Sequence, residues 1–230
     1  MPVASWTSWI CNNENIMQRL LLAGLVGLGL MHSPESMAES NTYTLSEGDS
    51  KLYVQVFKKR GGAASALAHD HVILATGWSG SVTWDTANVG ACSVNISLPV
   101  SGLAPDTDTM RNLVGYSSRL SATNQAKVKG NIMSLTQLAV EHFPTITYNS
   151  TSCTGSGSAI TVTGNLTIRG ASKAITVPME IQADGSSFAA KGTFTATHED
   201  FGFAPYSAMG GALRNETEMR FTVDVKGSAQ

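Results

Sequence analysis

Two of the five histidines in the chain flank an aspartate in the segment ALAHDHVILATGW, residues 66–78. Because side chains alternate along a strand, His69 and His71 would share one face there, with Asp70 on the other. Two imidazoles on one face can hydrogen-bond a polar headgroup, pack as a hydrogen-bonded pair at a barrel mouth, or ligate a metal. All three interpretations stay open, whereas a catalytic dyad is disfavoured because no nucleophile stands out in the sequence.

A metal site would need further ligands, and His142 and His198 are the additional histidines that could supply them. A phosphate headgroup would instead favour arginine, whose planar guanidinium matches it, and Arg111 in DTDTMRNL is the candidate. The sequence has no Gly-x-Ser-x-Gly elbow, no Cys-x-x-Cys pair and no phosphate-binding glycine loop. These observations favour a non-catalytic binding protein, and we expect no metal or organic cofactor.

Period-two alternation of apolar and polar residues runs through most of the chain after residue 40. In KLYVQVFK, residues 51–58, the apolar side chains would share one face, and TEMRFTVDV, residues 217–225, repeats the pattern. Many short alternating segments separated by turn residues are typical of antiparallel sandwiches and barrels. We therefore predict an all-β fold.

The alternation breaks in the long connection around residues 105–140. Val128, Ile132 and Leu135 follow helical spacing, with Ser121 or Thr123 as the N-cap. Met110, Leu113 and Val114 indicate a shorter helix before it. One or two short helices are therefore expected to interrupt the strands.

Several positions in phase with the predicted core carry very small residues, namely Gly80, Gly164, Ala190, Gly192 and Ala196. Small inward side chains leave space inside a barrel, which bulky ones would otherwise fill. Glycines also mark bends and bulges where strands curl. The pattern is compatible with an internal cavity, with bends, or with both.

The N-terminal segment has the features of a secretory signal peptide. Arg19 precedes the twelve-residue apolar run LLLAGLVGLGLM, and Ser36 and Ala38 fit the small-residue positions of a cleavage site. We expect residues 1–38 to be a leader, with Met17 as the suspected start of translation, and residues 39–230 to form one domain. The apolar run is too short to span a membrane comfortably, and we expect no transmembrane segment in the mature protein.

Removal of the leader changes the formal charge from −2 to −1, so nothing indicates a nucleic-acid partner. Cys92 and Cys153 remain, and an exported protein with two cysteines suggests a disulfide. The alternation argues against it, because Cys92 shares a face with Ile96 whereas Cys153 is out of phase with Tyr148. One thiol would point inward and the other outward, so the pattern disfavours the bond.

Four segments in this order resemble the YceI-like family. GNLTIRGASKAITV, residues 164–177, is similar to the hairpin G-x-L-T-I-x-G-x-T-K-x-V-x-V, and FPTITYNS, residues 143–150, to the strand F/Y-P-x-I-x-F-x-S. EDFG, residues 199–202, resembles R-x-D-F-G, and WSGSVTWD, residues 78–85, resembles F-x-G-x-V-x-F-D. The resemblance spans about residues 53–225, and the HDH element marks a divergent branch.

The resemblance implies an extended, lipocalin-like antiparallel barrel in the bacterial periplasm, with an apolar cavity for an isoprenoid lipid such as a quinone or an isoprenyl phosphate. His69, His71 and Arg111 would then meet the polar end of the lipid. The side chains expected to contact the lipid elsewhere are Trp78, Val82, Trp84, Leu166, Phe194 and Phe221. The alternative is a periplasmic metal-binding accessory protein that uses His69 and His71, and a homodimer is left open.

Overall fold

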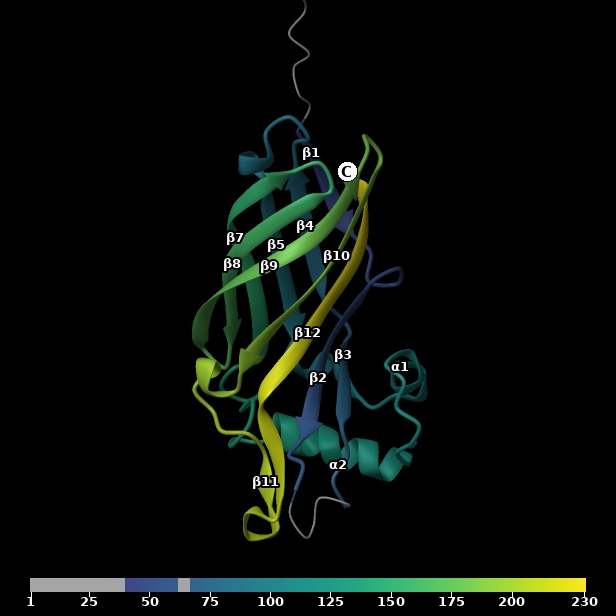
Figure 1. Cartoon of the computed structure of the whole chain (residues 1–230), viewed down its shortest axis with the longest axis vertical. Helices are drawn as coiled ribbons and strands as arrows, with labels where there is room; N and C mark the ends of the chain where they lie inside the picture. The colour runs from purple at the N-terminus through teal and green to yellow at the C-terminus, as the bar shows by residue number, and fades with distance from the viewer. Residues whose placement is uncertain (1–39, 62–66) are drawn as a thin grey trace, which may run out of the picture. The chain divides into compact units, whose positions relative to one another are not determined.

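The computed structural model describes residues 40–61 and 67–230. The expected leader, its cleavage site after Ala38 and the suspected start at Met17 lie outside these residues. Strands dominate the described part, and Figure 1 shows them coiled into a barrel with helix α2 at one end. The predicted all-β, extended antiparallel barrel is confirmed.

Eight strands form a closed antiparallel ring in the order β1-β4-β5-β7-β8-β9-β10-β12, and β1 pairs with β12 to complete it. Their bounds are β1 Asn41–Leu45, β4 Ser79–Trp84, β5 Ser93–Pro99, β7 Thr145–Ser156, β8 Ala159–Ile168, β9 Ala171–Ala183, β10 Ser187–Thr197 and β12 Leu213–Ala229. Closure leaves no unpaired edge at the seam of this ring.

The long strand β12 extends the wall beyond the ring. Its last residues pair with β1, whereas its earlier part pairs with β2, so β1 and β2 follow each other along one edge of the same strand. The sheet continues from β2 to β3 and then to β6. The bounds are β2 Lys51–Lys58, β3 His71–Ala75 and β6 Leu103–Pro105, while β11, Ser207–Ala208, pairs with the start of β12.

Two helices interrupt the strands where the alternation breaks. Helix α1 spans Asp108–Leu113, and helix α2 spans Ala122–Met133 with Ser121 as its N-cap, whose hydroxyl accepts a hydrogen bond from the Asn124 N–H. The predicted short helices and one of the two predicted caps are confirmed. Among residues 40–61 and 67–230, no helix has the length and hydropathy that a membrane span requires.

The inward glycines mark close approaches between neighbouring strands. A Cβ on Gly164 would lie 2.6 Å from the Tyr148 hydroxyl oxygen, and one on Gly192 would lie 2.6 Å from the Pro178 carbonyl oxygen. Ala190, by contrast, lines an internal cavity. The cavity interpretation therefore holds at Ala190, whereas Gly164 and Gly192 make room for neighbouring atoms.

The expectation that Cys92 and Cys153 stay apart is wrong, because the structure joins them in a disulfide with their Cα atoms 6.0 Å apart. The reason is a β-bulge in β7. Ser150 pairs with Gly164 but Ser152 pairs with Thr163, so Thr151 is an extra residue that reverses the alternation. Cys153 consequently points inward and is buried.

Candidate functional site: an apolar cavity with histidines in its wall

An elongated cavity of about 300 Å³ lies inside the barrel. Met219, Phe221, Val223 and Val225 of β12 all line it, a stretch of roughly 20 Å at about 3.3 Å per residue. Its lining is overwhelmingly apolar, and its volume falls at the lower end of the range of about 300–1,000 Å³ seen for ligand pockets. This shape and lining suit a narrow apolar chain.

Several of the side chains predicted to contact a ligand do line this cavity, namely His71, Val82, Leu166, Phe194 and Phe221. Phe194 and Phe221 stack with their ring centroids 4.7 Å apart. Trp78 and Trp84 are buried in the surrounding wall but are not among the described lining residues, and Trp84 packs edge-on against Phe188.

The two histidines of the HDH element lie in different environments. Strand β3 begins at His71, which points inward in phase with Ile73 and Ala75, as predicted. His69 precedes the strand and is exposed, so the expectation that both histidines share a strand face is wrong for His69. The strand begins two residues later than the alternation indicated.

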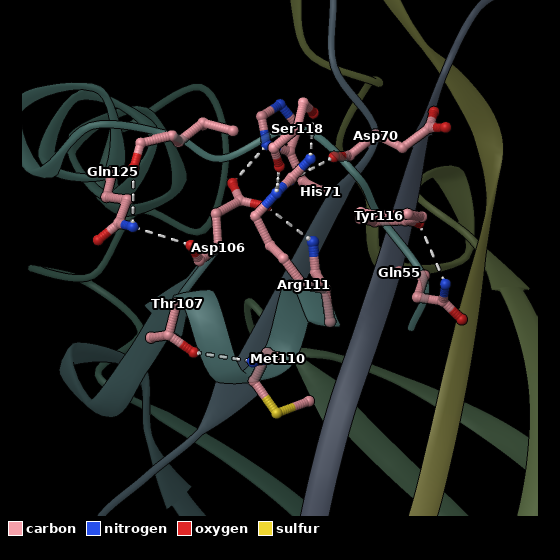
Figure 2. A network of polar contacts seen from close by, with 12 residues as sticks. Gln55, Asp70, His71, Asp106, Thr107, Met110, Arg111, Tyr116, Ser118 and Gln125 are labelled. Atoms are coloured by element: carbon pink, nitrogen blue, oxygen red, sulfur yellow. Dashed lines mark hydrogen bonds and ion pairs between the residues drawn. The ribbon is translucent and has the colours of Figure 1, made fainter. Parts of the chain in front are cut away.

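Asp106, which the sequence did not single out, is the centre of a buried polar network around His71 (Figure 2). Its Oδ2 lies 2.6 Å from His71 Nδ1, and its Oδ1 accepts hydrogen bonds from Arg111 Nη1 at 2.7 Å and from the Val72 N–H at 3.2 Å. Burial would raise the pKa of this carboxyl, but the contacts with His71, Val72 and Arg111 outweigh burial and lower the pKa.

Arg111 holds this carboxylate from the side away from the cavity. Its guanidinium also donates to the Asp70 carbonyl at 3.0 Å and to the Ser118 carbonyl and hydroxyl, and it stacks over the Tyr116 ring. The side chain is only 2% exposed and is not among the described lining residues. The structure therefore places Arg111 behind His71, where it fixes the position of Asp106.

Two further polar side chains that the prediction left out of the ligand contacts line the cavity. His198 is buried, and its Nδ1 lies 2.8 Å from the Thr217 carbonyl oxygen. The Tyr148 hydroxyl is buried without a hydrogen-bond partner among the described residues, and burial raises its pKa to about 12. The alternation of β7 could have identified Tyr148 as a cavity-lining residue, because it is in phase with Ile146. It could not have shown that the Tyr148 hydroxyl lacks a hydrogen-bond partner within the described part of the chain.

No constellation of three or more metal-ligating side chains occurs in residues 40–61 and 67–230. His71 Nδ1 is already occupied by Asp106, and His142 is exposed with its ring against Phe143. His71 Nε2 remains available, and the lining around it is apolar apart from a few uncharged polar groups. The arrangement is better suited to hydrogen bonding at one end of an apolar chain.

Comparisons with known proteins agree with this architecture. Residues 55–226 match the model of the YceI-like domain, whereas no curated protein matches the chain. BcnA of Burkholderia cenocepacia is 14% identical, with a TM-score of 0.59 over 79% of this chain and 98% of BcnA. The Campylobacter jejuni YceI protein is also 14% identical, with a TM-score of 0.52 over 69% of this chain and 84% of that protein. The chain belongs to the YceI-like family.

Proposed function

We propose that the protein is an exported, non-catalytic carrier that holds an isoprenoid-type lipid, such as a quinone or an isoprenyl phosphate, inside its barrel. The observation that carries this proposal is the elongated apolar cavity along β12. A methyl-branched apolar chain would gain roughly 25 cal/mol for each Å² of its surface removed from water there. The resemblance to the YceI-like family supports the same class of ligand.

The polar groups that line the cavity support binding of a ligand rather than catalysis. Among the described residues, the lining contains no serine, cysteine or acidic side chain that could serve as a nucleophile or carboxylate base. His71 and His198 are the titratable imidazoles of the lining, and Asp106 holds His71 in a buried network of hydrogen bonds. The Cys92–Cys153 disulfide supports export, because such bonds persist in oxidising compartments.

Filling the cavity tests the proposal. Ala190→Phe would place a ring in the space that the lipid chain would occupy, so we expect at least about tenfold weaker binding of an isoprenoid quinone. Titration of the purified protein with the quinone, followed by native mass spectrometry, measures the loss. Ala189→Phe is the matched control, because Ala189 directly precedes Ala190 in β10 and is not among the residues that line the cavity.

Failure of the wild-type protein to bind the quinone or any other isoprenoid would overturn the proposal. So would equal binding by the wild type and the Ala190→Phe variant, because the lipid would then lie outside the barrel.

A further inference from the structure

The Asp106 network determines which nitrogen of His71 carries the proton. Arg111 and the Val72 N–H both donate to Asp106, so the carboxyl is ionised and can only accept hydrogen bonds. His71 Nδ1 lies 2.6 Å from that carboxylate and must therefore carry the hydrogen that it donates. In a neutral imidazole the other nitrogen, Nε2, is then an unprotonated acceptor.

His198 has the same tautomer for an independent reason. Its Nδ1 lies 2.8 Å from the Thr217 carbonyl oxygen, which can only accept, so Nδ1 carries the hydrogen here as well. Burial lowers the pKa of His198 below its ordinary value and keeps the ring neutral near pH 7. Its Nε2 is therefore a second acceptor, and neither Nε2 has a hydrogen-bond partner within the described ranges.

Strand register places both imidazoles at the same end of the cavity. His71 pairs with Val56, Val56 with Met219, and Met219 with Ala196, so these four residues form one row across four strands. His198 follows Ala196 by two residues and lines the cavity with His71. This end of the apolar cavity thus presents two ring nitrogens that need a hydrogen-bond donor.

We propose that the cavity selects an isoprenoid lipid whose polar end is a hydroxyl donor, either a free isoprenoid alcohol or the reduced, quinol form of an isoprenoid quinone. This rests on the proposed function and narrows it. A quinone carbonyl, an ether or a fully ionised phosphate offers only acceptors and would give neither nitrogen a donor, which is unfavourable once the lipid has displaced water from the cavity. Hydroxyl donors satisfy them.

Two matched ligand pairs test this selectivity. Geranylgeraniol and its methyl ether share one chain and differ in the hydroxyl hydrogen, and a menaquinol can be compared with its menaquinone under anaerobic conditions. At pH 8, where a free imidazole is neutral, we expect wild-type protein to bind the donor of each pair roughly tenfold more tightly. Preference in only one pair identifies whether the ligand is an alcohol or a quinol, and either result supports the proposal.

Asp106→Asn tests the tautomer of His71 directly. Its Oδ1 can still accept from Arg111 and Val72, but its amide nitrogen replaces Oδ2 and donates to His71 Nδ1. His71 Nε2 then becomes a donor, so the preference for the hydroxyl compound should fall several-fold. Asp108→Asn is the matched control, because Asp108 is exposed and pairs with Arg119 outside the cavity.

If Asp106→Asn does not fold, His71→Phe removes one of the two acceptors while leaving the Asp106–Arg111 pair, and the preference should fall in the same way. Equal wild-type affinity for both members of both pairs would overturn the selectivity while leaving a lipid carrier intact. Absence of binding to all four ligands would instead overturn the proposed function itself.

Discussion

At Asp106, one buried carboxylate connects segments far apart in the sequence. Its side chain contacts His71 at the start of β3 and Arg111 in α1, while its carbonyl accepts a hydrogen bond from Gln125 in α2 at 2.9 Å. The backbone of Asp106 has a φ of 55°, a left-handed conformation that aspartate and asparagine tolerate better than most residues. The same residue therefore shapes the turn and orients the imidazole.

His198 should make the stability of the protein depend on pH. Burial lowers its pKa in the folded state, so the unfolded chain takes up a proton first as the pH falls below about 6.5. The stability that neutral His198 contributes is thus complete above that pH and is lost as the pH falls towards the folded pKa. We expect a loss of about 1 kcal/mol per pH unit in this window.

Urea unfolding of wild type and His198→Asn between pH 7.5 and 5 measures this contribution. The asparagine amide can still donate to the Thr217 carbonyl but does not titrate in this range, so the variant should show a shallower decline. Parallel curves for the two proteins would show that His198 does not contribute to the pH dependence.

Sequence alone could place His71 on the inner face but could not find its partner. Period-two alternation is a local signal, and it correctly put His71 in phase with Ile73. Asp106 lies 35 residues away, and nothing local shows that its side chain turns back to β3. The same limitation made Arg111 look like a ligand contact, whereas its guanidinium donates to Asp70, Asp106 and Ser118 within the protein.

At the scale of elements, the position of Cys153 relative to the bulge in β7 decides whether a covalent bond can form. Deletion of Thr151 alone would remove the bulge but leave Cys153 opposite Val162, whereas deletion of Thr151 and Ser152 together would place Cys153 opposite Thr163, on the outer face and away from Cys92. We therefore expect two free thiols in the two-residue deletion variant and a loss of roughly 2–4 kcal/mol of unfolding free energy. Alkylation of the unreduced, denatured protein followed by mass spectrometry counts the thiols.

The control is deletion of Thr151 alone, which keeps Cys153 opposite Val162 and should leave both cysteines inaccessible to alkylation. An intact disulfide in the two-residue deletion variant would contradict the role assigned to the strand face of Cys153.

Elements with strong local signals were predictable, and the bulge was not. The N-cap at Ser121 and the spacing of Val128 and Ile132 were sufficient to place α2, because helix signals lie within a few residues of each other. A bulge, by contrast, results from pairing with another strand, and the order TITYNSTSC contains no glycine that would indicate it.

At the scale of the whole molecule, the ring depends on a short seam between the first and last strands. Tyr43, Thr44 and Leu45 pair with Ala229, Ser228 and Gly227, and the Gln230 N–H donates to the Thr42 carbonyl. Deletion of residues 227–230 should therefore open the ring. We expect a loss of about 2–4 kcal/mol, since each net hydrogen bond contributes about 1 kcal/mol.

Urea unfolding and light scattering measure the loss of stability and the association expected from two exposed strand edges. Deletion of Gln230 alone is the control and should have a much smaller effect, because it preserves all three residue pairs of the seam. An unchanged unfolding midpoint after deletion of residues 227–230 would show that β1 holds its place through β4 alone.

This seam also sets an order of events during synthesis. Strand β1 can pair with the end of β12 only after residues 227–229 have been synthesised, and this contact spans almost 190 positions. Every other strand of the ring has emerged by then, so the barrel passes through a stage as an open, curved sheet with two bare edges. Such distant contacts form slowly and leave nascent chains prone to aggregation. The topology therefore makes this open intermediate, rather than the finished barrel, the state that must be protected from aggregation in the cell.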